Sequence, residues 1–347
     1  MAVSITIKEI AKKAGVSIGT VDRVLHNRGR VAEATKSNVL KIAEEGNYSS
    51  NIYARNLKLN KTYSIAVVLP PENFYWKKQK EGIKQGIAAY ESMGFTQKEY
   101  ILQETDDQAL ADAIELVLAA KPDGIIISPG FFHQDSRALD ALKISKIPYV
   151  FVDSNIANGG NLTFIGQDSF KSGQVAAGLL DKGFCNPYEL FIITFSRIDL
   201  VQKTILSRIK GLRHYYTQNS NAAINIHEIN LEQDNTTIVQ LMDMLTAIKK
   251  PIHLFVPNSS SHLLGLALLP LRKQLKLRFV GYDLLGVNEK LLKNGVLDYI
   301  IHQNPQMQGK LAVQALYQHL VLVKEVELNQ YLPLDIITKE NLEYANG

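Results

Sequence analysis

The chain has 347 residues, of which 46% are hydrophobic and 21% are charged, a composition that excludes a disordered or collagen-like protein. Its single cysteine, Cys185, excludes an intrachain disulfide. No apolar run approaches the ~20 residues that a bilayer-spanning helix needs, and residues 1–13 lack the apolar core of a signal peptide. We therefore expect two or three domains in a cytoplasmic protein without membrane association.

Positive charge is concentrated at the N-terminus. Residues 1–61 hold eleven lysines and arginines against five acids, a net charge of +6, whereas the other 286 residues carry a net charge of −2. A basic excess of this kind favours a polyanionic partner, although a solvated surface is the alternative explanation.

Two short helices are predicted first. Thr6 and Glu9 have the spacing of a capping box, apolar residues follow at helical spacing, and Gly15 can end the helix. Ser17 can cap a second helix, whose apolar positions include Val21. Two short helices joined by a tight turn that contains glycine are typical of a helix-turn-helix.

A third helix is predicted over residues 33–45, and Gly46 is expected to end it. Three helices of this length can bury one small core. The residues of the third helix expected to face that core are Val39, Leu40, Ile42 and Ala43.

This stretch resembles the headpiece of the LacI/GalR family of bacterial repressors. The matching residues are 6–11, 14–17 and 20–25, and Asn51, Ala54, Arg55 and Leu57 continue the match into the family's hinge. The resemblance implies a helix-turn-helix DNA-binding headpiece over residues 1–50. It further implies a hinge helix and linker over residues 51–61 and a ligand-binding and dimerisation domain over residues 62–347.

The second helix is expected to enter the major groove of DNA. Arg23 can bond guanine O6 and N7 together, with a phosphate contact as the alternative. Ile18 and Gly19 stand where family members often read bases, but neither offers a side-chain hydrogen bond, and Ile18 can only touch a thymine methyl. Asp22 departs from the family's small hydroxyl residue. It could repel phosphate, accept from cytosine, or pair with Arg23 or Arg30.

Further DNA contacts are expected from polar headpiece residues and from the hinge. Asn51 is a reasonable N-cap for the hinge helix, Ala54 lies within it, and Leu57 stands at the position of the family's minor-groove wedge. Packing of Leu57 on the rest of the protein is the alternative. The polar candidates, for which helix capping is the alternative, are Ser17, Thr20, His26, Asn27, Arg30 and Tyr48.

From Thr62 onward the pattern changes to alternating strands and helices, which predicts parallel sheets covered by helices. The length suits two doubly wound parallel sheets in two lobes, with a ligand cleft at the carboxyl ends of the strands. Strands are predicted at residues 64–69, 124–128, 149–153, 190–194, 253–257, 279–283 and 299–302, and helices at residues 78–93, 109–120, 172–180 and 238–248, among others.

The sequence contains no GxGxxG after a strand, no Walker loop, no HExxH and no GxSxG. The eight histidines show no metal-ligand spacing, and the pair Asp106–Asp107 is interpreted as a helix cap. We therefore expect no catalysis, no cofactor and no metal.

Polar and aromatic side chains follow the predicted strand ends, where a parallel fold brings them to one cleft. Such groups suit a sugar, because its hydroxyls take paired hydrogen bonds and its apolar face stacks on an aromatic ring. The residues in question are Asn73, Tyr75, Trp76, Asp153, Ser154, Asn258, Asp283 and Gln303.

Residues 62–340 resemble the periplasmic sugar-binding-protein fold, closest to the ribose-binding type, and the resemblance implies ligand contacts from these residues. Ser154 departs from it, because an arginine often stands there. Arg208 is our choice for the family's ligand arginine and Arg197 is the reserve. The alternatives are capping for Asp153 and Asp283, packing for the aromatic residues, and a surface salt bridge for Arg208.

The sequence thus predicts a transcription regulator, by default a repressor. Its headpiece is expected to bind a near-palindromic DNA operator as part of a homodimer, and its body to close on a sugar or sugar derivative. No leucine-heptad tail follows, which favours a dimer over a coiled-coil tetramer. The rival hypotheses are a sugar-binding protein for uptake and an α/β enzyme acting on carbohydrate. The intact headpiece argues against the first, and the missing motifs argue against the second.

Overall fold

The computed structural model describes residues 5–25, 29–46, 48, 61–104, 106–130, 136–183, 187–195, 202–219, 224–232 and 235–345. The chain divides into two compact units, Met1–Asn60 and Lys61–Gly347, which we treat separately. The predicted hinge helix, with Asn51, Ala54 and Leu57, lies outside the described residues.

The first unit contains the three predicted helices, α1 (Ile7–Ala14), α2 (Ile18–Leu25) and α3 (Glu33–Glu45). The capping box is confirmed, because Thr6 N donates to Glu9 Oε2 over 2.8 Å and Glu9 N donates to Thr6 Oγ1 over 3.3 Å. Gly15 ends α1 in the left-handed region at φ 67°, which lets the chain turn directly into α2.

One small apolar core holds these helices together. Its buried members are Ile10, Ala11, Val21, Val24, Val39 and Ala43. The prediction that Leu40 faces this core is wrong, because its side chain is 44% exposed. Leu40 follows the buried Val39 directly, and successive helical residues point about 100° apart.

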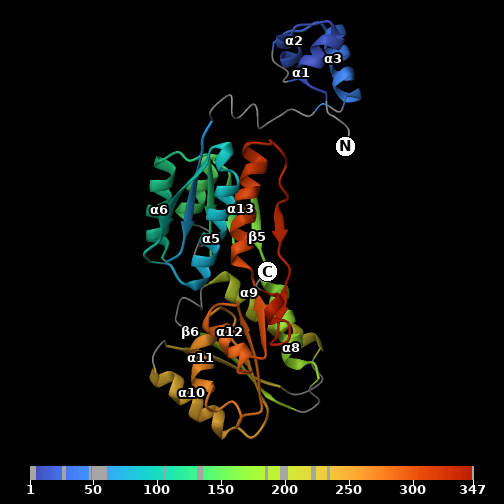
Figure 1. Cartoon of the computed structure of the whole chain (residues 1–347). Coiled ribbons are helices and arrows are strands. Elements are labelled where there is room, and N and C mark those ends of the chain that lie inside the picture. Colours follow the sequence, from blue (N-terminus) through green and yellow to red (C-terminus); the bar gives the residue numbers. More distant parts are fainter. Residues whose placement is uncertain are drawn as a thin grey trace. The chain divides into compact units, whose positions relative to one another are not determined.

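The second unit consists of two lobes, each built on a six-stranded sheet with helices on both faces (Figure 1). In the first sheet all neighbouring strands are parallel, in the order β11-β5-β4-β3-β1-β2. Its strands are β1 (Tyr63–Leu69), β2 (Phe95–Ile101), β3 (Gly124–Ile127), β4 (Tyr149–Val152), β5 (Thr163–Gly166) and β11 (Asn329–Tyr331).

The second sheet has the order β12-β10-β9-β8-β6-β7. It departs from the predicted all-parallel sheet at one edge, where β12 runs antiparallel to β10. A single extended segment that returns from the other lobe forms this edge. The strands are β6 (Glu189–Phe195), β7 (Asn225–Leu231), β8 (Ile252–Phe255), β9 (Leu277–Tyr282), β10 (Tyr299–His302) and β12 (Asp335–Ile337).

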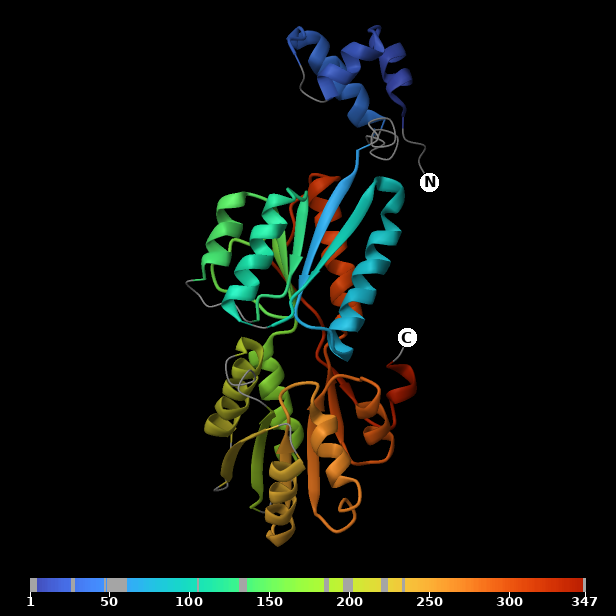
Figure 2. The same cartoon turned by 90° about the vertical axis from the view of Figure 1, so that its left-hand side faces the viewer.

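Helices cover both faces of each sheet. On the first lobe, α5 and α13 lie on one face and α6 and α7 on the other (Figure 2). The helices of this lobe are α5 (Phe74–Ala89), η1 (Glu91–Met93), α6 (Asp107–Ala119), α7 (Arg137–Ser145) and α13 (Pro305–Leu320). Those of the second lobe are α8 (Ser169–Asp181), α9 (Lys203–Asn219), α10 (Asn235–Ala247), α11 (Ser261–Leu268), α12 (Val287–Lys293) and η2 (Leu342–Tyr344).

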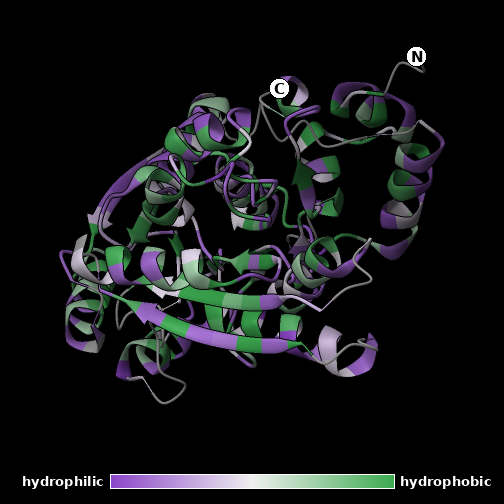
Figure 3. Cartoon of the chain, turned by 90° about the horizontal axis from the view of Figure 1, so that it is seen from below, coloured by the Kyte–Doolittle hydropathy of each residue, from purple (hydrophilic) through white to green (hydrophobic). Residues whose placement is uncertain are grey.

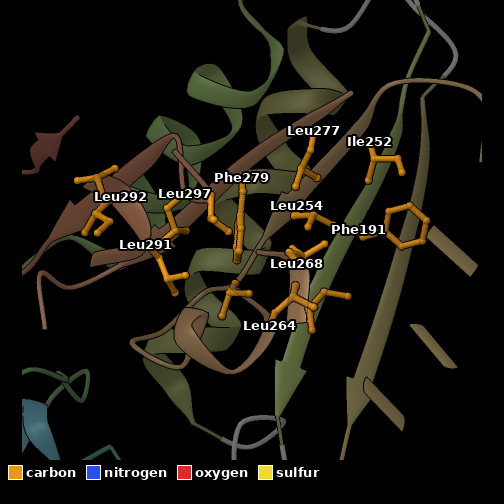
Figure 4. Close-up of a cluster of buried hydrophobic side chains, with 14 of the residues drawn as sticks. Phe191, Ile252, Leu254, Leu264, Leu268, Leu277, Phe279, Leu291, Leu292 and Leu297 are labelled. Carbon is orange, nitrogen blue, oxygen red and sulfur yellow. The ribbon is translucent and has the colours of Figure 1, made fainter. Parts of the chain in front are cut away.

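Hydrophilic and hydrophobic residues alternate along the outer helices (Figure 3), as in amphipathic helices that cover a core. In the second lobe, side chains such as Phe191, Leu254 and Phe279 meet Leu264 and Leu291 in one apolar cluster (Figure 4). Within the described part of the chain, no helix combines the length and the apolar character needed to span a membrane.

The chain passes between the lobes three times, from β5 to α8, from β10 to α13 and from β11 to β12. Gln167, at the first passage, ties the three together, because its Nε2 donates to the carbonyls of His302 over 2.8 Å and Pro333 over 2.6 Å. The carboxyl ends of the central strands of both sheets therefore face each other around these passages.

Candidate functional site

A cavity of about 560 Å³ lies between the lobes, at the carboxyl ends of the strands. Its volume falls within the roughly 300–1,000 Å³ typical of small-molecule sites. Eight residues predicted to contact a ligand line this cavity. They are Asn73, Tyr75, Trp76, Asp153, Arg208, Asn258, Asp283 and Gln303.

The first turn of α5 forms one wall. Asn73 is the N-cap, and its Oδ1 accepts from Trp76 N over 3.0 Å. The helix begins at Phe74, before the predicted start at Lys78, so both aromatic residues lie in its first turn. The Tyr75 and Trp76 rings meet edge to face with centroids 4.9 Å apart, and only 7% of Trp76 is exposed. This wall offers an apolar surface beside polar groups.

Asp153 follows β4 in the first lobe and adopts the left-handed conformation at φ 66°. Its Oδ1 accepts from the Tyr75 hydroxyl over 2.8 Å, and its Oδ2 accepts from Ser154 Oγ over 3.0 Å. Its backbone N donates to Gln308 Oε1 over 3.0 Å. Burial raises the pKa of Asp153, and the positive charge of Arg208 opposes that rise.

Asp283 follows β9 in the second lobe and occupies the equivalent position, at φ 64°. It accepts from the Gln303 backbone N over 3.2 Å and from Gln303 Nε2 over 2.7 Å. Burial raises the pKa of Asp283 to about 7, against the opposing charge of Arg208. Its Oδ1 lies 3.8 Å from His302 Nδ1, but burial lowers the pKa of His302 to about 4, so this histidine is neutral at pH 7.

Arg208 projects from α9 and is 2% exposed, which contradicts the alternative of a surface salt bridge. Its NH1 donates to the carbonyl of Pro257 over 2.7 Å, and its NH2 donates to Gln303 Oε1. Its guanidinium carbon lies 3.9 Å from the centroid of the Tyr282 ring. The arginine is therefore held from three directions at the cavity wall.

In the first unit, α2 presents a stripe opposite its core face. Ile18 and Asp22 are four residues apart, as are Gly19 and Arg23, so the four side-chain positions share one side of the helix. Ile18 is 51% exposed. The other face of α2 packs through Val21 and Val24. The exposed positions of this stripe, Ile18, Gly19 and Arg23, are accessible to a partner.

Comparison with known protein families matches both units. Residues 6–51 match the family described as bacterial regulatory proteins, lacI family, and residues 65–323 match the periplasmic binding protein domain. The chain is 30% identical to a structure described as a LacI transcriptional regulator from Bacteroides fragilis, over 82% of this chain and 99% of that one, with a TM-score of 0.74. The chain belongs to the LacI family of bacterial regulatory proteins.

Individual LacI-family relatives differ in how far they align. The HTH-type transcriptional repressor PurR of Mannheimia succiniciproducens is 33% identical, but the match spans about half of each chain, 51% of this one and 52% of that one. The PurR repressor of Haemophilus influenzae is 27% identical over 95% of both chains. A transporter solute-binding protein from Bacillus halodurans with bound myo-inositol shares the fold of the body at 18% identity, covering 82% of this chain and 96% of that one, with a TM-score of 0.70.

Membership of the LacI family makes the chain a DNA-binding transcription regulator and favours a regulatory role over an enzymatic one.

In the headpiece, Ser17 caps α2, with its Oγ accepting from Thr20 N over 3.1 Å and lying 2.9 Å from Thr20 Oγ1. Tyr48 packs on the headpiece core, and Arg23 and Arg30 are exposed. His26, Asn27 and Arg197 lie outside the described residues.

Ser154, which was also predicted to contact the ligand, is not among the residues that line the cavity. It is 3% exposed, and its hydroxyl turns to Asp153 and Thr204. Sequence reasoning also missed several lining residues. Gln103 and Glu104 follow β2, a strand that was not predicted, Phe195 ends β6, and Gln202, Thr204 and Ile205 lie at the start of α9.

Proposed function

We propose that this LacI-family regulator is a repressor that binds a near-palindromic operator as a homodimer and senses a small carbohydrate in the interlobe cavity. One observation carries the choice of ligand: polar side chains from both lobes converge beside an aromatic wall. Asp153 and Asn73 come from the first lobe, Asn258 and Asp283 from the second, and Trp76 supplies the wall. Carboxylates and amides can take paired hydrogen bonds from hydroxyls, and an indole face suits the C–H face of a sugar ring.

The exposed stripe of α2 supports the DNA-binding half of the proposal. Arg23 offers a fork for guanine, and Ile18 offers a methyl contact for thymine. A single small headpiece reads few base pairs, and a twofold dimer doubles the number, which accounts for a near-palindromic site. The regulator acts in the cytoplasm, where the chromosome is.

Communication between the two sites follows from where the ligand binds. A ligand that contacts both lobes favours the arrangement in which they are close, and in a dimer this alters the spacing of the two headpieces. By thermodynamic linkage, ligand and operator then change each other's affinity by the same factor. Repression relieved by ligand is the proposed direction.

The first experiment is thermal unfolding of the full chain against pentoses, hexoses, inositols, uronic acids and sugar phosphates. A ligand at 100 times its dissociation constant stabilises the folded state by about 2.7 kcal/mol, which is easily detected. A sugar that raises the melting temperature should then weaken binding to an operator selected in vitro. A panel without any stabilising compound would contradict the carbohydrate assignment.

A second measurement distinguishes a DNA-binding regulator from the rival hypothesis of a sugar-binding protein for uptake. Operator affinity should fall steeply as salt rises, because phosphate contacts release counterions. DNA binding that is absent, or indifferent to salt, would favour the uptake protein.

A further inference from the structure

A chain of hydroxyl groups connects the two lobes at the wall of the cavity, which both Thr204 and Asp153 line. Thr204 Oγ1 lies 2.6 Å from Ser154 Oγ, which lies 3.0 Å from Asp153 Oδ2. Ser154 has one hydroxyl proton and gives it to the carboxylate, so Thr204 must be the donor in the first bond. Ser154, Thr204 and Asp153 are 3%, 5% and 5% exposed, so water competes little for these bonds.

The bond between Thr204 and Ser154 crosses from one lobe to the other. Ser154 follows β4 of the first lobe, whereas Thr204 lies in the first turn of α9 in the second. Other groups approach closely at the same place. A Cβ on Gly130 of the first lobe would lie 3.1 Å from Ser154 Oγ and 3.7 Å from Gln202 Nε2 of the second lobe. The hydroxyl bond thus belongs to a packed interlobe contact.

The short side chain at position 154 makes this contact possible. The Ser154 hydroxyl lies between Asp153 and Thr204, and the small side chain lets Thr204 approach its oxygen. Asp153 then receives one hydrogen bond on each carboxylate oxygen, from Tyr75 in its own lobe and from Ser154, which is itself held by the opposite lobe. Each oxygen keeps further acceptor capacity for a ligand.

We propose that Thr204 and Ser154 are positioning residues that orient the Asp153 carboxylate for the ligand and hold the lobes together before the ligand arrives. The ligand part rests on the proposed function, and the interlobe part does not. Loss of the hydrogen bond between Thr204 and Ser154 leaves a buried hydroxyl without its partner. It thereby lowers the fraction of molecules in the arrangement that can bind the ligand.

The test uses the full chain with Thr204→Val, which keeps the side-chain volume but removes the hydroxyl, and Thr204→Ser, which retains the hydroxyl. Thr217→Val is the matched control, because Thr217 is on the same helix and its hydroxyl donates to Arg213 O within that helix. Small-angle X-ray scattering without ligand should give a larger radius of gyration for Thr204→Val than for the wild type, Thr204→Ser or Thr217→Val. An unchanged radius in Thr204→Val overturns the interlobe role, and this result needs no ligand.

The second readout is affinity for whichever carbohydrate stabilises the wild type in the panel. Thr204→Val should bind it about 2- to 10-fold more weakly, the factor expected for one net hydrogen bond. Thr204→Ser should restore wild-type affinity. Equal affinities of Thr204→Val and Thr204→Ser overturn the positioning role. If no carbohydrate binds the wild type, the proposed ligand class is wrong. The scattering result still decides whether the bond between Thr204 and Ser154 holds the lobes together.

Discussion

Two aspartates at equivalent strand ends dominate the chemistry of the cavity. Asp153 and Asp283 both adopt the left-handed conformation, at φ 66° and 64°, which few residues other than glycine tolerate. Both carboxylates are buried, and burial of a charge is unfavourable unless hydrogen bonds and opposite charge offset it. Buried carboxylates at matching strand ends of the two lobes are typical of a binding site rather than of a stabilising core.

The raised pKa of Asp283 predicts a pH dependence of stability. The folded state holds the Asp283 proton more tightly than the unfolded chain does, so ionisation opposes folding. Between the ordinary pKa of 3.8 and the folded value of about 7, this group lowers the free energy of unfolding as pH rises. Asp283→Asn cannot ionise and should lack that component. Urea unfolding at pH 5 and pH 7.5 should therefore show the variant gaining stability relative to the wild type as pH rises.

Asp140→Asn provides the control for this prediction. Asp140 lies in the first turn of α7, is exposed and is not among the residues that line the cavity, so its replacement removes one carboxylate without changing the cavity. A constant difference between Asp283→Asn and the wild type across that pH range would show that Asp283 is already ionised at pH 5.

Among the elements, two helix pairs, α5 with α13 and α8 with α9, pack closely against each other, and both depend on glycine. A Cβ on Gly82 would overlap the carbonyl oxygen of Gln306, and a Cβ on Gly173 would overlap that of Arg208. Both lobes thus contain a helix pair that packs closely because a glycine of one helix faces the backbone of the other. In the second lobe it also fixes the backbone from which Arg208 reaches the cavity.

Gly173→Ala should therefore destabilise the body by about 1–3 kcal/mol, the cost of overpacking a close contact. Gly178→Ala on the same helix is the matched control. Its Cβ would lie 3.7 Å from the Tyr215 ring, an ordinary contact, and alanine favours a helix over glycine by about 1 kcal/mol. Urea unfolding should give the two variants opposite signs. Equal effects would mean that helix propensity, not the contact with α9, decides.

The elements found by sequence reasoning are those with a strong local signal. β3, β4 and β8 are short runs buried on both faces, and each was predicted. The edge strands β2 and β7 were missed, because they carry mixed polar residues with one side exposed. The residues of the cavity were likewise predicted only where the sequence around them carries a strong local signal.

Asp153 and Asp283 were predicted because they directly follow buried strands. Thr204 and Gln202 were missed, because their importance depends on how closely the second lobe approaches the first. Spacing along the chain carries no record of that distance. The orientation of the Ser154 hydroxyl toward Thr204 depends on the same approach, so the sequence does not indicate it.

At the scale of the whole molecule, the unit expected to bind DNA and the unit expected to bind the ligand differ in charge. The basic excess lies in residues 1–61, and the acidic groups of the cavity lie in the body. Changes confined to one unit should therefore affect one binding constant at a time, while the coupling between the two constants requires both units.

A crossed pair of variants tests this division. Arg23→Ala should weaken operator binding by about 1–3 kcal/mol, the value of one good base contact, and leave carbohydrate affinity unchanged. Asp283→Asn should leave operator affinity of the ligand-free protein unchanged and abolish the response to carbohydrate, because it replaces one of the two buried acceptor oxygens, such as the one that accepts from Gln303 Nε2, with an NH2 donor. Fluorescence anisotropy on an in vitro selected operator, with and without carbohydrate, measures both. Lys41→Ala, an exposed α3 residue 4.0 Å from Glu45, controls for loss of positive charge. A change in ligand-free operator affinity in Asp283→Asn would show that the cavity sets the headpiece geometry even when empty.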